Sequence, residues 1–329
     1  MSAPITSSAA SSPVAHEPRP SSASTVQKTK IGATAGAWLR SLIYLGPALV
    51  LFALFSYRPF IHAIWLSLNV TDAAGEVVRF NGLNYYARIF NLDLAHPNDE
   101  FLRSIGLSFE FALMVVPLGI AAGVGLAQLA AVKVRGIRIF RTIFTSSIAI
   151  SIASAGVIFG MLYSPVVGLM RWLVDLLQLP QPGVLDNFAT ALPAVALMTI
   201  WTSLGFNFII SLAGIQAIPQ DVYESGALDG ATGWTSFRHI TLPLLSPTLL
   251  FLLVINTIGA LQAFTQFNVL INGVGPQGST NVFVYSTFRS FWYDNRYGFA
   301  SAMSIVLFVI LFVLSFIQFR GLDRRVHYG

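Results

Sequence analysis

Long apolar runs separated by short polar segments dominate the 329-residue chain. A helix needs about 20 predominantly apolar residues to cross the hydrocarbon core of a bilayer. Six stretches reach that length, and the pattern predicts an all-α integral membrane protein with six transmembrane helices. The predicted spans are 41–68, 104–130, 139–162, 191–215, 247–270 and 299–319.

Composition supports this prediction and excludes other classes. Hydrophobic residues make up 55% of the chain and charged residues only 10%, whereas a soluble domain carries about 25% charge. The net charge of +5 does not indicate nucleic-acid binding, because the basic residues lie at the ends of apolar runs rather than in one patch. The absence of cysteine excludes a disulfide framework, a thiolate metal site and a cysteine nucleophile.

The first 36 residues differ from the rest of the chain. They are rich in Ser, Ala and Pro and show no apolar periodicity, so they cannot bury enough surface to offset the entropy of ordering. We predict a disordered cytoplasmic tail over 1–36 and a membrane domain over 37–329.

The basic residues predict the orientation, since cytoplasmic loops carry an excess of Lys and Arg. The segment between the second and third spans holds Lys133, Arg135, Arg138 and Arg141 without an acidic residue. With six spans, this segment lies on the same side as both termini, so both termini are predicted to be cytoplasmic. The C-terminal end carries Arg320, Arg324 and Arg325, and the opposite segments carry Asp72, Glu76, Asp93, Asp99, Glu100, Asp175, Asp186 and Asp294.

Residues 221–247 form a polar island between the fourth and fifth spans. Asp221 followed three residues later by Glu224 has the spacing of a capping box, which predicts that Asp221 is the N-cap of a short helix. Asp229-Gly230 is expected to end that helix, because glycine readily takes a positive φ. A second short helix is expected next, with apolar residues spaced by 3, 3 and 4 on one face: Trp234, Phe237, Ile240 and Leu244.

This order of residues resembles the coupling loop, or EAA loop, of the permeases of ATP-binding-cassette importers of the carbohydrate-uptake type. In that family the loop docks onto the ATPase subunit. The family's Glu-Ala-Ala reads Glu224-Ser225-Gly226 here, and Gly226 weakens the helix by about 1 kcal/mol relative to Ala. Gly226→Ala is therefore expected to be mild. The resemblance implies an ATPase-coupling role for Glu224, Ala227, Asp229, Gly230, Ala231, Trp234, Phe237, Ile240 and Pro243.

Outer segments add to the resemblance, which covers about residues 41–329. The stretch from Phe80 to Tyr85, the Asn272-Gly273-Val274-Gly275-Pro276 segment and the start of the last span at Tyr297 are similar to segments of that family. Val274 and the wider spacing after it depart from the family's pattern. The likeness leans toward the sn-glycerol-3-phosphate and oligosaccharide members.

Catalytic motifs are missing from the chain. There is no G-x-x-x-x-G-K-[ST] phosphate loop, so we expect no ATP hydrolysis by this chain and no cofactor of its own. The resemblance implies that ATP and Mg²⁺ are bound by a partner ATPase. The five histidines lack ligand-like spacing with acidic residues, and no metal site is predicted.

Amide side chains inside the spans are candidates for a substrate path. Amides in a membrane face a neighbouring helix or a wet path, and they suit hydroxyl-rich ligands because they both donate and accept. Gln262 and Gln266 form an i, i+4 pair on the predicted fifth helix. Hydrogen bonding between helices is the alternative role for each residue. The candidates are Asn207, Asn256, Gln262, Gln266 and Asn268.

Together these observations predict a permease subunit of an ATP-driven, binding-protein-dependent importer in a bacterial or archaeal cytoplasmic membrane. The resemblance implies a second permease subunit, two ATPase subunits and an extracytoplasmic binding protein as partners, within membrane lipid. The predicted substrate is a sugar or a polyol phosphate. The absence of Arg and Lys from the fourth and fifth spans favours a neutral sugar. The alternative, a secondary transporter or channel, would be expected to show inverted repeats and an intramembrane charge relay.

Overall fold

The computed structural model describes residues 35–90, 100–132, 135–166, 168, 172, 176 and 183–323. Of the tail predicted over residues 1–36, residues 1–34 lie outside the described part of the chain. Several charged residues used for the predicted orientation also lie outside it: Asp93, Asp99, Lys133, Asp175, Arg324 and Arg325. The chain divides into two compact units, Met1–Phe55 and Ser56–Gly329.

The first unit contributes helix α1 (Ala35–Phe52), and the π-helical turn η1 (Ala53–Tyr57) follows it. Pro47 lies inside α1, which is more common in membrane helices than in soluble ones. From Ile43 onward the large apolar side chains of α1 are exposed. Such a helix suits an apolar surrounding rather than water.

The second unit opens with helix α2 (Arg58–Ser67), an antiparallel hairpin of β1 (Asn69–Thr71) and β2 (Val77–Phe80), and helix α3 (Asn84–Ile89). The Asp72 carboxylate accepts hydrogen bonds from the N–H groups of Ala74 and Glu76, and Gly75 takes a φ of +86° in the turn. The mostly helical architecture agrees with the prediction, but the sequence pattern did not reveal this hairpin because its strands are too short to show alternation.

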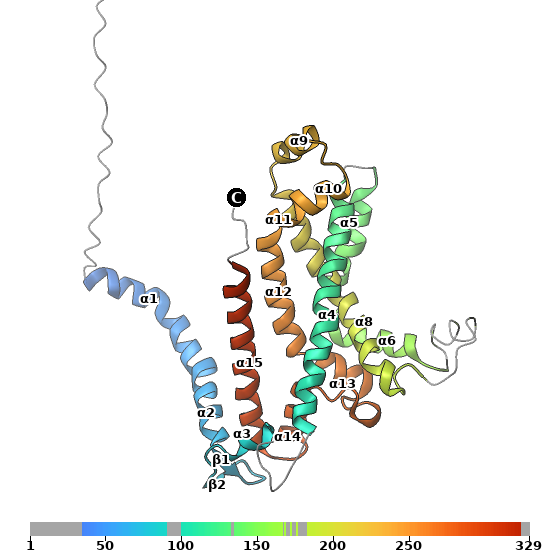
Figure 1. Cartoon of the computed structure of the whole chain (residues 1–329). Helices are drawn as coiled ribbons and strands as arrows, with labels where there is room; N and C mark the ends of the chain where they lie inside the picture. The colour runs from blue at the N-terminus through green and yellow to red at the C-terminus, as the bar shows by residue number, and fades with distance from the viewer. Residues whose placement is uncertain are drawn as a thin grey trace, which may run out of the picture. The chain divides into compact units, whose positions relative to one another are not determined.

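Helices α4 (Glu100–Ala131) and α8 (Phe188–Gln216) make the most extensive contact in this unit. Gly119 and Gly123, one turn apart on α4, face Asn207 of α8, and a Cβ on Gly123 would meet Asn207 Cβ at 2.5 Å. Small residues at this spacing let two membrane helices approach closely. The remaining long helix, α15 (Tyr297–Asp323), contacts α2, α12 (Ser246–Leu261) and α14 (Phe283–Trp292) (Figure 1).

Length and composition identify candidate membrane spans among the described residues. Four helices qualify as they stand: Ile43–Ser67, Glu100–Ala131, Phe188–Gln216 and Tyr297–Gly321. Two bent pairs of helices qualify together, so the number rises to as many as six if each pair is one span. The first bend falls inside the predicted third span, whereas the second lies at Leu245, between the predicted short helix of the polar island and the predicted fifth span.

The predicted third span, 139–162, is bent by 102°. Helix α5 (Ile137–Thr145) and the 3₁₀ turn η2 (Ser146–Ala149) form its first arm, and α6 (Ile152–Tyr163) forms its second. Ser151 separates them in an extended conformation, and its Oγ accepts a hydrogen bond from the N–H of Ser154 at 3.1 Å. Ser151 is therefore a helix N-cap inside what hydropathy alone indicated as one helix.

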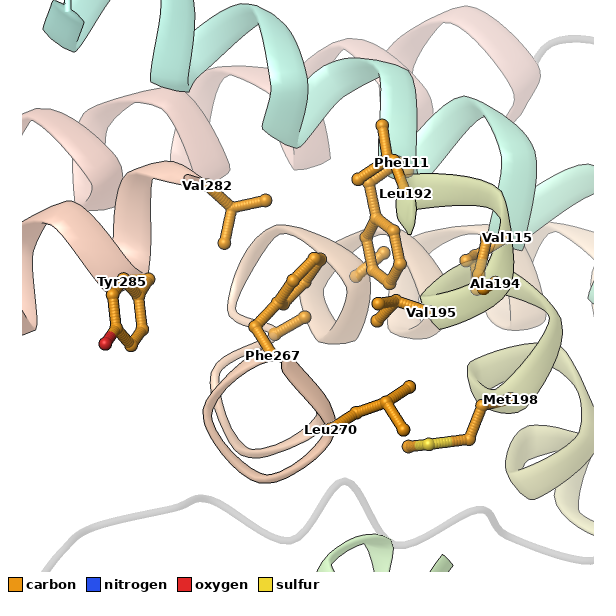
Figure 2. Close-up of a cluster of buried hydrophobic side chains, with 14 of the residues drawn as sticks. Phe111, Val115, Leu192, Ala194, Val195, Met198, Phe267, Leu270, Val282 and Tyr285 are labelled. Atoms are coloured by element: carbon orange, nitrogen blue, oxygen red, sulfur yellow. The ribbon is translucent and has the colours of Figure 1, made fainter. Parts of the chain in front are cut away.

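The predicted fifth span, 247–270, is also interrupted. Helix α12 ends at Leu261, and α13 (Thr265–Ile271) begins after a three-residue break. Neither Gly nor Pro lies in that break. The core explains it, because Phe267 is fully buried and its ring lies 4.8 Å from that of Phe111. Figure 2 shows Phe267 pointing into the cluster that holds Phe111 of α4 and Val195 of α8.

A tight loop follows α13 and leads through the 3₁₀ turn η4 (Pro276–Gly278) to α14. Asn272 and Gly273 both have positive φ, and the ring of Tyr285 occupies the space that a Cβ on Gly273 would need. The Tyr285 hydroxyl donates to the Asn272 carbonyl at 2.9 Å. The segment with the divergent Val274 is thus closed around an aromatic side chain.

Candidate functional site

The polar island begins with helix α9 (Gln220–Leu228). Its N-cap is Pro219 and makes no side-chain cap hydrogen bond, so the prediction that Asp221 caps this helix is wrong. Asp221 lies within the first turn, where its charge suits the helix dipole. Glu224 does not reach back to an N-cap amide; its Oε1 accepts a hydrogen bond from Gln220 Nε2 at 2.8 Å.

Helix α9 ends in a Schellman motif built by Asp229, Gly230 and Ala231. Gly230 has a φ of +83°, which agrees with the turn predicted at Asp229-Gly230. Its N–H donates to the carbonyl of Ala227 at 3.1 Å, and the N–H of Ala231 donates to that of Gly226 at 2.8 Å. These two bonds satisfy carbonyls that a helix end leaves open, so the motif fixes the direction in which the chain leaves α9.

The second helical segment contains α10 (Trp234–Ser236), a π-turn η3 (Phe237–Thr241) and α11 (Leu242–Leu244). Pro243 lies just beyond the π-turn and has no N–H for the carbonyl one turn back. A π-turn adds a residue to the turn, which shifts the side chains of this segment relative to a regular α-helix; of the predicted apolar face, Phe237, Ile240 and Leu244 are partly buried. Thr241 and Leu245 are fully buried, whereas Trp234 is 71% exposed.

Two contacts join α9 to the π-turn. The hydroxyls of Tyr223 and Thr241 lie 3.1 Å apart and form a hydrogen bond. Ile240 fills the space beside Gly226 that a side chain there would need. The coupling segment, residues 220–244, is therefore internally braced, and it leaves apolar side chains such as Leu228, 90% exposed, on its surface.

Most of the predicted coupling residues lie on the surface of this segment. Glu224, Ala227, Asp229 and Gly230 are exposed, and Ala231, Phe237, Ile240 and Pro243 are partly buried. Phe237 packs against a core cluster centred on α4 and α8, and its ring lies 5.2 Å from that of Trp234. An exposed segment anchored to the helical core in this way is suited to contact with another protein.

A cavity of about 350 Å³ lies between α4, η2, α6, α8, α12 and α13. Asn256 and Gln266 contribute predicted substrate-path side chains to its wall, but Gln262 and Asn268 do not line it. Gln262 is the exposed C-cap residue of α12, so the break in the span separates the predicted Gln262–Gln266 pair. The wall consists of Val115, Ile148, Ile150, Ile152, Thr199, Thr202, Ser203, Phe206, Ile255, Asn256, Gly259, Ala260 and Gln266.

Asn207 does not line the cavity but holds one of its lining residues, Asn256. It is fully buried, and its Oδ1 accepts a hydrogen bond from Asn256 Nδ2 at 2.8 Å. This is the interhelical role that the sequence left open for Asn207. Sequence reasoning missed Thr199, Thr202 and Ser203, although three hydroxyl residues within five positions of an apolar span are a recognisable signal.

The profile of the family described as "Binding-protein-dependent transport system inner membrane component" matches residues 100–328. The chain belongs to this family. It is therefore a permease component of a transport system rather than an enzyme. Its family consists of multi-pass proteins of the inner membrane.

Two curated relatives of this permease are sn-glycerol-3-phosphate transport system permease proteins UgpA. The protein from Agrobacterium fabrum is 29% identical over 289 residues, covering 87% of this chain and 96% of the relative. The protein from Brucella abortus is 32% identical over 288 residues, covering 87% and 95%.

Two solved structures share the fold of this permease. A chain of a bacterial ABC transporter involved in the import of the acidic polysaccharide alginate matches with a TM-score of 0.73 and 25% identity, covering 87% of this chain and 96% of that one. A second match is described as the bacterial alginate transporter in complex with a periplasmic protein that holds an alginate pentasaccharide, with a TM-score of 0.73 and 24% identity.

Proposed function

We propose that this permease is one of two membrane subunits of an ATP-driven importer for a hydroxyl-rich substrate. A second permease subunit, two ATPase subunits and an extracytoplasmic binding protein complete the complex. ATP and Mg²⁺ bind to the ATPase subunits, and their closure moves the coupling segment. The spans then alternate between outward-open and inward-open states.

The main support for this proposal is that one helix, α12, extends from the coupling segment to the cavity. Helix α12 begins two residues after α11 ends, and ten residues into α12 Asn256 lines the cavity. A ten-residue stretch of α-helix is about 15 Å long. A displacement of the coupling segment is thereby passed to a side chain of the cavity through a single rigid element.

Substrate chemistry follows from the cavity and the relatives together. Amide and hydroxyl side chains of Thr199, Thr202 and Gln266 offer hydrogen bonds to hydroxyl groups. The relatives are described as transporters of sn-glycerol 3-phosphate and of alginate, and both compounds carry several oxygen groups. These observations support a sugar, an oligosaccharide or a polyol as substrate.

The proposed orientation places the coupling segment and both termini in the cytoplasm. Arg135 lies just before α5, and Arg138 and Arg141 lie within it. Helix α5 is on the same side of the second unit as α9 and α10 of the coupling segment (Figure 1). The excess of basic residues on cytoplasmic loops supports this assignment.

Reconstitution into lipid vesicles tests the proposal. The purified chain alone should show neither ATP hydrolysis nor uptake. The complete complex should take up the sugar that its binding protein carries, only when ATP is supplied on the side of the ATPase subunits. Uptake by the chain alone, driven by an ion gradient, would favour the secondary transporter instead.

A further inference from the structure

We propose that the 350 Å³ cavity admits neutral hydroxyl-bearing substrates and disfavours anions, because its polar side chains present mainly hydrogen-bond acceptors. This inference rests on the proposed function and assigns its substrate class. The selectivity comes from where the protons of the lining groups point.

The three hydroxyls of α8 have already used their protons. Thr199 Oγ1 donates to the carbonyl of Val195 at 2.8 Å, and Thr202 Oγ1 donates to that of Thr199 at 2.9 Å. Ser203 Oγ donates to the carbonyl of Ile200 at 3.0 Å. A hydroxyl has one proton and two lone pairs, so these side chains offer only lone pairs to a molecule in the cavity.

The amide protons of Asn256 are also engaged in hydrogen bonds within the protein. Its Nδ2 donates to Asn207 Oδ1 and to the carbonyl of Leu252, both at 2.8 Å. An amide nitrogen has two protons, and both are therefore engaged within the protein. The Oδ1 atom of Asn256 remains as an acceptor toward the cavity.

Gln266 differs from the other polar residues of the wall. Its side chain is 5% exposed, and among the described residues its amide makes no hydrogen bond. It can both donate and accept. None of the described residues that line the cavity carries a charge, so Gln266 is the one lining side chain with a proton to give.

This wall matches a substrate that brings its own donors. A sugar or polyol hydroxyl donates to an acceptor and still accepts from Gln266. A phosphate or carboxylate group brings lone pairs and negative charge, and burial of an anion against a wall with one donor side chain, Gln266, and no cation is unfavourable. The cavity thus points away from the anionic substrates named for the relatives and toward neutral ones.

Thiol labelling tests this inference in the complete transporter, because the chain contains no cysteine. Thr202→Cys places one thiol in the wall, and Leu83→Cys, at a 70% exposed site outside the cavity, is the control. Both variants are treated with methanethiosulfonates bearing a trimethylammonium or a sulfonate group, with the partner subunits free of cysteine. Each rate is normalised to that reagent's rate with a free thiol in solution.

We expect the cationic reagent to react about tenfold faster than the anionic one at Thr202→Cys, since the lone pairs that Thr199, Ser203 and Asn256 turn toward the cavity give its uncharged wall a negative potential. No such preference is expected at Leu83→Cys. Adding Thr199→Val to Thr202→Cys removes one acceptor and should reduce the preference. Equal rates, or faster reaction of the sulfonate, would overturn the inference while leaving the placement of the path intact.

Failure of the proposed function gives a different result. If neither reagent reaches Thr202→Cys while Leu83→Cys is labelled, the cavity is not on a water-accessible path, and both proposals fail. ATP-driven uptake of labelled sn-glycerol 3-phosphate by the complete transporter would contradict the neutral substrate class alone. Its absence, with cationic preference at Thr202→Cys, is the result we expect.

Discussion

Ile240 packs its Cδ1 atom into the space that Gly226 leaves free by having no side chain. The coupling segment has two arms, α9 with Gly226 and the segment from α10 to α11 with Ile240. This contact therefore sets how closely the two arms approach each other. The sequence predicted a mild effect for Gly226→Ala, because alanine restores helix propensity. We now expect a loss of ATP-driven uptake per assembled complex of at most about threefold, because the flexible end of the Ile240 side chain must shift to admit the new Cβ.

A matched double variant checks this explanation. Ile240→Val removes the terminal methyl group, so uptake by the Gly226→Ala, Ile240→Val pair should return toward that of the unmodified protein. Ile240→Val alone is the control for lost packing. Equal loss in the single and double variants would show that the contact does not determine the approach of the arms.

Gly230→Val should uncouple ATP hydrolysis from transport. No described atom lies within 4 Å of the position of a Cβ at Gly230, so the penalty comes from its φ of +83° and amounts to about 1–2 kcal/mol. Gly230→Asn is the control, since Asn tolerates this conformation better. Uptake per assembled complex and ATPase rate are measured together; normal uptake by the valine variant would exclude a role for this turn in coupling.

The Tyr223–Thr241 hydrogen bond offers a direct measure of bracing between the two arms. Thr241 is fully buried, so Tyr223→Phe leaves its hydroxyl without this partner, at a cost of about 1–3 kcal/mol. Thr241→Val should be nearly as harmful alone, and the double variant should be better than the sum of the two. A double-mutant cycle on thermal stability of the assembled complex gives the coupling energy; a value near zero would refute bracing.

Substitutions of Gln266 and Gln262 are expected to affect the KM for uptake differently, because only Gln266 lines the cavity. Gln266→Leu removes the donor that faces the cavity and should raise the KM for uptake by about tenfold, the effect of leaving roughly 1.4 kcal/mol of hydrogen bonding unmade. Gln262→Leu, at an exposed position outside the cavity wall, should leave the KM unchanged. A reduced amount of complex with unchanged KM in Gln266→Leu would assign that residue a purely structural role.

Much of the architecture could be predicted because membrane helices and glycine turns leave strong local signals. Apolar length identified the regions of all candidate spans, and the Asp229-Gly230 pair identified a turn whose φ the structure bears out. Asp221 failed as a cap because Pro219 fits the start of a helix and moved its first residue back to Gln220. A capping-box spacing does not exclude a competing start nearby.

The interior of the transporter could not be predicted from periodicity. The break after Leu261 depends on the burial of Phe267 against Phe111, residues far apart in the chain. The direction of the Thr199 and Thr202 protons depends on backbone carbonyls that only the folded helix presents. Hydropathy indicated where α12 lies, but packing determined which of Gln262 and Gln266 faces the cavity.

The last helical segment of the polar island, Trp234–Leu244, meets helix α12, Ser246–Leu261, at a bend of 68°. In the proposed mechanism, a force on the coupling segment would rotate α12 about this bend. A rotation of about 10° about the bend would carry Asn256 roughly 2.5 Å sideways, given about 15 Å of intervening helix. Its 2.8 Å bond to Asn207 cannot stretch that far. If closure of the ATPase subunits rotates α12 as we propose, either α8 must move with α12 or the hydrogen bond between Asn256 and Asn207 must break. The second outcome would change the shape of the cavity, because Asn256 lies in its wall.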